Sequence, residues 1–447
     1  MTGAGATAAA VRAGRLSARH VAMRALASIE AAEPAMRAVT GILRDRALAD
    51  AAAVDAAVAA GRDPGPLAGV PYGVKDLFDV AGLPTTAGSA IYADAQPAAH
   101  DAEAVRRMQA AGAVLVATLN MDEFAYGFAT INARHGTTRN PHDPERLAGG
   151  SSGGSAAVVA ARLLPLALGS DTNGSVRVPA SLTGVYGLKP THGALPMAGV
   201  FPFAASFDDV GPFAANAADM ALVWEVLSDR RGAAGERPLR LARLGGRFRD
   251  NADPDQLAAI DALAADTPIL TLPDIARARS AAFLITAYEG GTLHRDALAE
   301  QAMAFDPAVR DRLIAGALLP RGLYEEALAF RETFHAEVDA TIAPYDVLLA
   351  PATPCTAPRI DDPWIVIDGK RVPARADLGI HTQPISFAGL PSLAVPLCRA
   401  AGALPIGLQL IGRRGGEAEL LRAATLWEAQ GLIGGAFPVP AIEGVGA

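Results

Sequence analysis

Residues 1–62 are rich in alanine, and their hydrophobic positions are spaced as on one face of a helix. Val21 and Ile29 lie on such a face, and Ser17 stands where an N-cap residue would begin the helix. Glycine and proline at 61–66 end this pattern. The hydrophobic spacing therefore predicts a helical N-terminal region that stops at a turn.

Short apolar runs farther along the chain predict buried strands. One covers 113–119 after a predicted helix at 100–111, and another covers 164–169 after a predicted helix of small residues at 155–161. An apolar run of this length, bounded by polar residues, is typical of a strand covered on both faces. The alternation of helix and strand predicts an α/β fold.

The second half of the chain returns to the same alternation after a helical stretch. Helices are predicted at 217–227, 281–300 and 322–342, and strands at 346–350, 392–397 and 406–411. We therefore expect one domain over 1–447, in which about 237–340 is a helical insertion over a single sheet. The segment 357–382 mixes Pro, Asp and Gly and is expected to be a loop. No repeat of 20 to 50 residues is visible, which excludes solenoids and propellers.

The composition limits the kind of partner. Lys and Arg number 39 against 47 Asp and Glu, giving a net charge of −8, and 51% of the residues are hydrophobic. This content excludes disorder for most of the chain, and the lack of clustered positive charge argues against direct binding of nucleic acid or anionic membranes. The longest apolar stretch, 156–168, is interrupted by Arg162 and Pro165 and is shorter than a membrane span. A small-molecule partner is expected.

The cysteines and the N-terminus bear on location. Cys355 and Cys398 are the only cysteines, so neither a disulfide framework nor a Cys-x-x-Cys pair exists, and we expect the reducing cytoplasm. Four arginines precede Glu30, as in a transit peptide, but the helix capped near Ser17 is the favoured interpretation. Nothing clusters His, Asp and Glu at ligand spacing, so neither a metal nor another cofactor is expected.

The glycine- and serine-rich segment 149–155 has three interpretations. It fits neither a phosphate loop nor a dinucleotide fingerprint, because no Gly-Lys-Ser/Thr follows and the glycines do not match the register. It satisfies the Gly-x-Ser-x-Gly elbow with Ser151 as nucleophile, but the preceding 139–146 is turn-like and charged rather than a strand. A flexible linker is disfavoured, because the segment runs directly into a helix and a buried strand.

The third interpretation joins this segment to 171–177, a second glycine-containing turn with serine. Two such turns can hold two hydroxyls and an oxyanion site at close range. None of the eight histidines lies in such a setting, which leaves the proton acceptor to be found. Lys75 has apolar neighbours, and a lysine in apolar surroundings loses its charge more readily. A solvated Lys75 paired with Asp76 is the ordinary alternative, and only the joint pattern argues against it.

The run from Leu67 to Pro190 resembles the amidase signature family. It matches the Gly-Val-Pro-x-x-x-Lys-Asp element at 69–76, the Gly-Gly-Ser-Ser-Gly-Gly-Ser element at 149–155 and the Gly-Ser-Asp-x-x-Gly-Ser-x-Arg-x-Pro-Ala element at 169–180. Similarity continues beyond this core and covers most of the chain. The resemblance implies a mixed central sheet covered by helices on both faces, with the signature core at about 67–190.

The resemblance also implies a Ser-cisSer-Lys triad in an enzyme that hydrolyses small amides. Ser175 would be the nucleophile, Ser151 the relay after a cis bond from Gly150, and Lys75 the base. The acyl group would pass to Ser175, ammonia or an amine would leave, and water would cleave the acyl-enzyme.

The remaining signature residues receive supporting roles. Backbone N–H groups of Thr172, Asn173, Gly174 and Ser175 are expected to form the oxyanion hole. Many relatives have glycine where Asn173 stands, so its side chain is expected to restrict the substrate. Supporting roles are expected for Ser152 and Ser155, and a structural ion pair is favoured for Asp171 and Arg177 over a substrate role.

Two branches of the family resemble the chain most. One is the glutamyl/aspartyl-tRNA amidotransferase, whose amidase chain produces ammonia from glutamine for a partner. The other is the carboxybiuret hydrolase branch, which is the closer one in 126–128, 171–178 and 382–387. A general aliphatic or aryl amidase is a further alternative. The carboxybiuret branch implies a small partner subunit, and we expect a homodimer or a heterotetramer.

Substrate contacts outside the signature are expected from polar or cationic side chains. Tyr126, Arg310, Arg321 and Tyr324 are the candidates, since arginine binds a planar carboxylate or urea group in a bidentate manner. A position on a helix surface is an equal alternative for each of them.

Overall fold

The computed structural model describes residues 3–229, 235, 237–400 and 402–434. Within these residues one sheet of eleven strands crosses the whole molecule. Its spatial order is β1 (Val39–Ile42), β3 (Val114–Leu119), β2 (Pro71–Lys75), β8 (Leu166–Asp171), β10 (Asp209–Ala214), β9 (Tyr186–Lys189), β16 (Ser392–Pro396), β17 (Gly407–Ile411), β13 (Val347–Pro351), β11 (Leu241–Leu244) and β12 (Ile269–Leu270).

The sheet is mixed. Strand β2 runs parallel to β3 and β8, and β11 runs parallel to β12 and β13, whereas the other pairs are antiparallel. The predicted strands at 113–119, 164–169, 346–350, 392–397 and 406–411 are confirmed as β3, β8, β13, β16 and β17. All residues of these five strands are buried, which explains why most of their residues are apolar.

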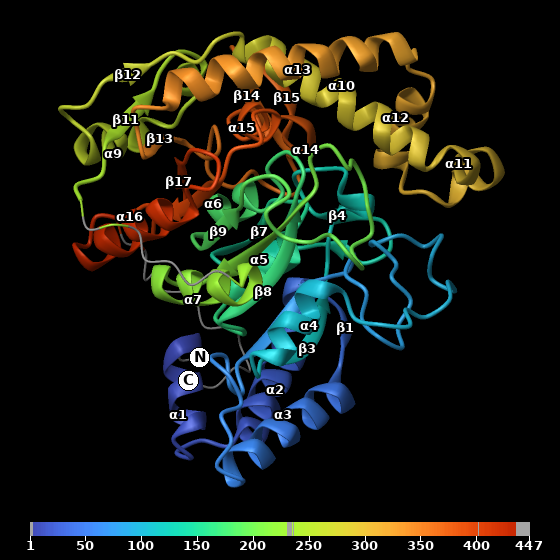
Figure 1. Cartoon of the computed structure of the whole chain (residues 1–447). Coiled ribbons are helices and arrows are strands. Elements are labelled where there is room, and N and C mark those ends of the chain that lie inside the picture. The colour runs from blue at the N-terminus through green and yellow to red at the C-terminus, as the bar shows by residue number, and fades with distance from the viewer. Residues whose placement is uncertain (1–2, 230–234, 236, 401, 435–447) are drawn as a thin grey trace.

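Helices flank the sheet on both faces (Figure 1). The first half contributes α1 (Ala4–Arg12), α2 (Ala18–Met36), α3 (Arg44–Ala59), α4 (Glu103–Ala110), α5 (Gly153–Ala160), α6 (Arg177–Thr183) and α7 (Ala217–Ser228). Helices α5 and α6 pack against each other, α5 on β8 and α6 on β9. Helix α7 packs on β10, and α4 and α16 (Glu417–Ala429) pack against α7. The predicted single α/β domain with a mixed sheet is confirmed.

The N-terminal prediction is confirmed with one addition. Ser17 caps α2 by accepting a hydrogen bond from the backbone N–H of His20, and Val21 and Ile29 are buried. The short helix α1 precedes it, so the predicted helix is the second one. Strand β1 was not predicted, because its four residues are only half-buried or exposed and carry no apolar run.

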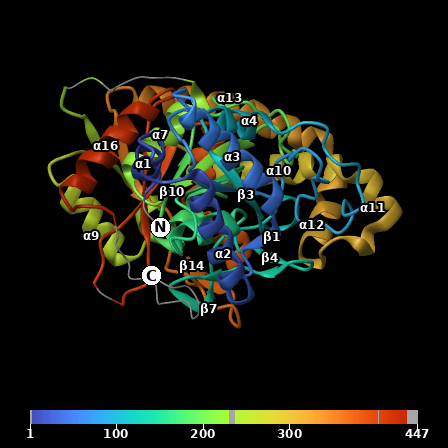
Figure 2. The ribbon, with the colours of Figure 1, turned by 90° about the horizontal axis from the view of Figure 1, so that it is seen from below.

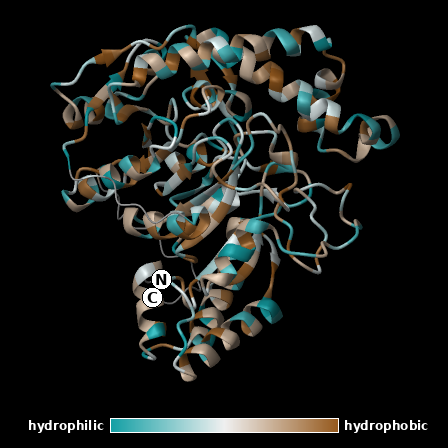
Figure 3. Cartoon of the chain, in the orientation of Figure 1, coloured by the Kyte–Doolittle hydropathy of each residue, from teal (hydrophilic) through white to brown (hydrophobic). Residues whose placement is uncertain are grey.

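The second half contributes the remaining helices, which form a layer at one side of the molecule (Figure 1). They are α8 (Arg247–Asp250), α9 (Pro254–Leu263), α10 (Ile275–Leu293), α11 (Arg295–Gln301), α12 (Pro307–Ala317), α13 (Arg321–Ile342), α14 (Ala374–Asp377) and α15 (Gln383–Phe387). Figure 2 places α11 and α12 at one end of the molecule and α9 and α16 at the other. Figure 3 shows that α10 to α13 carry both hydrophilic and hydrophobic residues, as partly covered helices do.

Three local expectations were wrong. The helix predicted at 281–300 is two helices, because α10 ends before His294 and α11 begins after it. The segment 237–340 is not purely helical, since it also supplies β11 and β12 to the sheet. The segment 357–382 holds the hairpin of β14 (Trp364–Ile367) and β15 (Lys370–Pro373), and then α14.

Two further small hairpins and two short 3₁₀ helices complete the elements. The hairpins pair β4 (Ile131–Asn132) with β5 (Gly136–Thr137), and β6 (Arg139–Asn140) with β7 (Asp143–Leu147). The 3₁₀ helices are η1 (Glu123–Ala125) and η2 (Ala302–Ala304). In the part of the chain that the structure describes, no helix is long and apolar enough to cross a bilayer.

Candidate active site

Lys75 is the last residue of β2, and the parallel neighbour β8 ends nearby. The register that pairs Val74 with Leu168 brings Ser170 beside the lysine. The Nζ of Lys75 donates hydrogen bonds to Ser151 Oγ at 2.7 Å and to Ser170 Oγ at 2.9 Å, and the lysine is fully buried. The Ser170 contact was not predicted.

Burial changes the chemistry of this lysine. Removal from water lowers the pKa of Lys75 from 10.5 to about 7, although the carboxylates of Asp122, Asp208 and Asp171 oppose that change. These carboxylates act through their charge, whereas the hydrogen bonds of Nζ go to the two serine hydroxyls. A large fraction of Lys75 is therefore neutral near pH 7.

Ser151 follows the cis peptide bond from Gly150, which is present as expected. Gly150 is packed so closely that a Cβ there would lie 2.4 Å from Asp122 Oδ2 and 2.5 Å from the backbone nitrogen of Ala129. Asp122 itself accepts hydrogen bonds from the backbone N–H groups of Ala129 and Thr130. The glycine is thus required by a close approach to the Asp122 loop, which also borders the site.

The turn after β8 brings Ser175 to the same place. The backbone N–H of Ser152 donates to the Ser175 carbonyl at 3.2 Å, and Ser152 Oγ donates to the Ser170 carbonyl at 3.1 Å. Ser155, one turn along α5, donates its hydroxyl to the carbonyl of Leu168 at 3.0 Å. These contacts join the two glycine-rich segments, so that Ser151 and Ser175 lie on adjoining turns.

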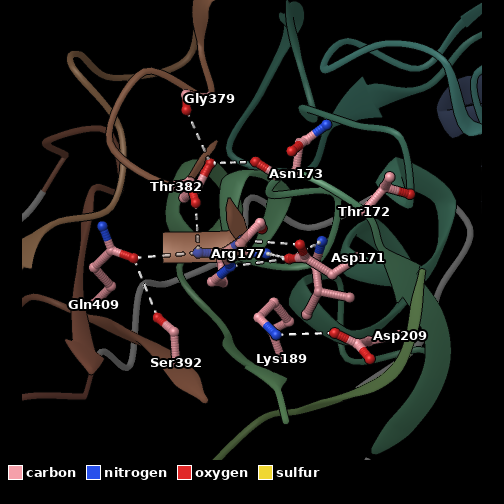
Figure 4. Close-up of polar contacts among 12 residues, drawn as sticks. Asp171, Thr172, Asn173, Arg177, Lys189, Asp209, Gly379, Thr382, Ser392 and Gln409 are labelled. Atoms are coloured by element: carbon pink, nitrogen blue, oxygen red, sulfur yellow. Dashed lines mark hydrogen bonds and ion pairs between the residues drawn. The ribbon is translucent and has the colours of Figure 1, made fainter. Parts of the chain in front are cut away.

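The turn 172–175 presents backbone N–H groups. Among the described residues, the backbone N–H groups of Asn173, Gly174 and Ser175 have no hydrogen-bond acceptor. Gly174 has a φ of +139°, and a Cβ there would lie 2.1 Å from Thr382 Oγ1, which itself donates to the Asn173 carbonyl (Figure 4). Only glycine fits at position 174. The three backbone N–H groups of this turn are available to a ligand.

Thr172 is held from the other side by a buried carboxylate. Its hydroxyl donates to Asp208 Oδ1 at 2.7 Å, and Asp208 Oδ2 accepts from the backbone N–H groups of Phe203 and Ala204. Burial raises the pKa of Asp208 to about 6, although these hydrogen bonds act in the opposite direction. Asp208 thereby connects Thr172 to the backbone at Phe203 and Ala204.

Asp171 and Arg177 form a buried ion pair below this turn (Figure 4). The guanidinium donates to Asp171 through Nε at 3.0 Å and Nη2 at 2.9 Å, and to the Thr382 carbonyl and Ser386 Oγ at 3.1 and 2.6 Å. A longer contact of 3.4 Å reaches Gln409 Oε1. Because both side chains are fully buried and the donors are used, this geometry suits a structural pair.

A pocket opens beside Ser175. It is lined by Ala125, Tyr126, Gly127, Phe128, Thr172, Asn173, Ser175, Phe203, Phe283, Thr286, Arg312, Arg375 and Gln383. Its cavity volume is about 20 Å³, little more than the space that one water needs. The lining joins the signature turn to α10, α12, α14 and α15, so elements from the second half cover the serine. The pocket is therefore narrow in this structure.

Two arginines contribute positive charge to this pocket. Arg312 lies over the ring of Tyr126, with its Cζ 3.6 Å from the ring centroid, and donates to the Tyr126 carbonyl at 3.0 Å. Arg375 forms an ion pair with Asp122 at 3.3 Å, and its buried Nε has no hydrogen-bond partner among the described residues. An unused guanidinium donor in a pocket suits an anionic or carbonyl group of a ligand.

Of the four predicted substrate-contact residues, one lines the pocket and three do not. Tyr126 lines the pocket, whereas the lining includes none of Arg310, Arg321 and Tyr324. Arg310 pairs with the neighbouring Asp311, and Arg321 is 79% exposed and pairs with Glu325. Tyr324 donates its hydroxyl to Glu289 at 2.9 Å. These three side chains therefore have partners outside the pocket.

Arg312 lines the pocket but was not among the predicted substrate contacts, although it lies two residues from Arg310, which was. Asp306 caps α12, and Val309 and Leu313 form its buried face. Arg312 follows Val309 by three positions and therefore lies near the same face of the helix. Arg310 is rotated by about 100° around the helix axis from Val309 and lies away from Arg312. The Asp306 cap predicts a helix here with Arg312 beside its buried face, but not that this face borders the pocket. No group of three or more His, Cys, Asp or Glu side chains in the described residues could hold a metal ion.

Comparison with known proteins gives the family. A family model described as Amidase matches residues 21–240 and 265–421. The chain belongs to the amidase family. It is an amide-hydrolysing enzyme, and the resemblance to amidase signature proteins is confirmed.

Individual amidases extend the comparison. The chain is 45% identical to AtzE of Pseudomonas sp. (strain ADP), which forms part of 1-carboxybiuret hydrolase, over 94% of this chain and 97% of that protein. It is 38% identical to the glutamyl-tRNA(Gln) amidotransferase A chain of Azoarcus sp. (strain BH72), over 88% and 90%. A solved structure from a vestigial protein complex bearing on the origins of an s-triazine catabolic enzyme superposes with a TM-score of 0.93 at 44% identity, covering 97% of this amidase and 99% of that chain.

Proposed function

We propose that this amidase cleaves a small C–N amide or urea-like bond and releases ammonia through an acyl-enzyme on Ser175. Lys75 acts as the base and Ser151 as the relay. The observation that carries the proposal is the 2.7 Å contact between a fully buried Lys75 and Ser151, whose turn is hydrogen-bonded through Ser152 to the pocket-lining Ser175. A buried amine that is largely neutral near pH 7 is suited to accept a proton.

The proposed proton path is short and balances. Neutral Lys75 accepts the Ser151 hydroxyl proton, Ser151 accepts the Ser175 proton, and Ser175 Oγ bonds to the substrate carbonyl carbon. The C–N bond then breaks as the same relay returns the proton to the departing nitrogen. Water repeats the path in reverse to release the acid and free Ser175.

The turn 172–175 supports this proposal as an oxyanion hole. Its N–H groups at Asn173, Gly174 and Ser175 have no acceptor in the described chain, and each such donor typically lowers the barrier by about 3 kcal/mol. Asp208 restrains Thr172, and Thr382 restrains the Asn173 carbonyl. The donors are therefore held in place before substrate arrives.

We further propose a substrate with a carboxylate or a similar planar anionic group, as in 1-carboxybiuret. The 45% identity to part of a 1-carboxybiuret hydrolase supports this, together with Arg312 and Arg375 in the pocket. A second candidate is the ammonia-producing chain of a tRNA-dependent amidotransferase, which the 38% identity to such a chain favours. A general aliphatic or aryl amidase is the third.

The test is an ammonia-release assay. The purified chain is offered biuret, 1-carboxybiuret generated in situ, glutamine, malonamide and aryl amides. Turnover of carboxybiuret above the others supports the first candidate, and turnover of glutamine supports the second. Absence of ammonia release from every compound by the folded chain, alone and with its partner, would contradict the proposal.

The partner is also a proposal. AtzE is one of the subunits of its enzyme, and the superposed structure comes from a protein complex, so a small second subunit in a heterotetramer, or else a homodimer, is expected. Co-expression with a small protein encoded beside the gene, followed by gel filtration, tests this. Failure to co-elute, with a monomeric elution volume, would contradict it. The cytoplasmic location belongs to the proposal as well, supported by the unpaired Cys355 and Cys398.

Activity is expected to depend on pH through Lys75. Only the neutral amine accepts a proton, so kcat/KM should fall about tenfold per pH unit below a pH of about 7 and level off above it. In Asp208→Asn the acidic limb should move to lower pH, because one carboxylate that raises the pKa of Lys75 is removed. Profiles from pH 5 to 9 measure both. An unchanged limb in the variant, or none in the wild type, contradicts this role of Lys75.

Arg375→Met is expected to raise KM for a carboxylate-bearing amide by about 10- to 100-fold and to change kcat less. The unused Nε would be lost as a donor to the anionic group. A neutral amide of the same size is the control substrate, and its KM should hardly change. An equal rise in both KM values would show that Arg375 does not recognise the carboxylate.

A further inference from the structure

Asn173 lines the pocket and lies on the turn that also carries Ser175. Its Nδ2 donates a hydrogen bond to Thr286 Oγ1 on α10 at 2.8 Å. The Thr286 hydroxyl has a single hydrogen, and it donates that hydrogen to the Ala282 carbonyl at 2.8 Å. Thr286 can therefore only accept from Asn173, which fixes the orientation of the asparagine amide.

This orientation leaves Asn173 Oδ1 as an acceptor without a donor. The oxygen is buried and has no hydrogen-bond partner among the described residues. A buried acceptor without a partner is costly, and such atoms in native proteins call for an explanation. Since Asn173 and Ser175 line the same pocket, a ligand bound beside the serine is the group that could supply the missing donor.

We propose that Asn173 Oδ1 accepts a hydrogen bond from an N–H of the substrate next to the scissile carbonyl. It thereby selects amide and ureido groups that carry an N–H over esters and N,N-dialkylated amides. The inference rests on the function proposed above and deepens it, because it names the group that the reacting end must carry.

The pocket then offers a ligand both hydrogen-bond donors and a hydrogen-bond acceptor. Arg312 and Arg375 supply donors, which suit the anionic or carbonyl end of a ligand. Asn173 supplies an acceptor, which suits an N–H. A compact molecule with a carboxylate at one end and a primary amide or ureido nitrogen at the other satisfies both. A site with a dedicated hydrogen-bonding group rejects an analogue that lacks the matching group, because the protein atom is left unpaired.

The test compares two substrates that form the same acyl-enzyme. Malonamate releases ammonia and monomethyl malonate releases methanol, and both leave the same malonyl group on Ser175. The ratio of their kcat/KM values therefore reports recognition of the leaving group, and the intrinsic reactivity of amide and ester cancels when variants are compared. The variants are Asn173→Leu, which keeps the shape without the acceptor, and Asn173→Gly.

We expect the amide-to-ester ratio to fall about 10- to 100-fold in Asn173→Leu, because amide hydrolysis loses a hydrogen bond that ester hydrolysis never makes. Thr286→Val removes the group that orients the amide and should give a smaller fall, whereas Thr286→Ser keeps the hydroxyl and should keep the ratio. If Asn173→Leu does not fold, Asn173→Gly and Thr286→Val carry the same comparison.

The outcomes separate this inference from the function on which it rests. An unchanged ratio in an active variant, or an equal loss on amide and ester, overturns the role of Asn173 alone. If the wild type cleaves neither malonate derivative nor any amide of the ammonia-release panel, the proposed function fails instead. A lowered ratio in Asn173→Leu together with an unchanged ratio in Thr286→Ser supports the inference.

Discussion

Replacing Ser175 with alanine is expected to lower kcat/KM for the best amide substrate by about 10⁴-fold or more, with little change in the free energy of unfolding. The change removes only the oxygen that attacks the carbonyl. Lys75→Met should cause a loss of similar size, because the side chain keeps its bulk in the fully buried site and loses the amine. Initial rates of ammonia release at substrate concentrations below KM measure both.

The two changes act on one unit, so the double variant should be no more than a few-fold worse than either single variant. Ser181→Ala is the matched control, because Ser181 is a fully buried serine on α6 whose hydroxyl contacts Thr353 Oγ1 and accepts from the backbone N–H of Gly407, and does not contact Lys75. It should retain most activity. Substantial turnover by Ser175→Ala, or a loss in Ser181→Ala as deep as in Ser175→Ala, would contradict the assignment of the nucleophile.

The strands that could be predicted share one property. β3, β8 and β16 each contain a short apolar run because both faces are covered, and this run is visible in the local sequence. β2 is equally buried, but its five residues begin with Pro71 and include Gly73, which indicate a turn when considered alone. Its place between β3 and β8 is decided by pairing with distant segments.

The candidate site divides in the same way. The two glycine-rich turns are local, so their serines and glycines could be identified from the sequence. The contact between Lys75 and Ser170 depends on the parallel pairing of β2 with β8 and could not. Arg312 and Arg375 reach the pocket from α12 and α14, more than 130 residues beyond Ser175, and only tertiary packing brings them there. The substrate-facing half of the site was therefore beyond local patterns.

Arg177→Met is expected to lower the free energy of unfolding by about 3–5 kcal/mol, because it leaves the carboxylate of Asp171 buried without its partner. Both side chains are fully buried, and the bidentate contacts are 2.9 and 3.0 Å. Burial alone would raise the pKa of Asp171, and the Arg177 guanidinium instead holds it below its ordinary value. Denaturant unfolding followed by circular dichroism measures the change.

A double-mutant cycle tests whether the cost comes from the unpaired charge. Asp171→Asn combined with Arg177→Met should be less destabilising than the sum of the single changes, because neither variant residue leaves a buried charge. Arg321→Met is the control, since it breaks a pair with Glu325 in which the side chains are 79% and 57% exposed and should leave the free energy of unfolding nearly unchanged. Additive effects at Asp171 and Arg177 would show that the two residues stabilise the fold independently. The guanidinium also donates hydrogen bonds to the Thr382 carbonyl and Ser386 Oγ. Arg177→Met should therefore loosen the segment around Thr382, which packs closely against Gly174. We expect this change to lower kcat as well as the free energy of unfolding.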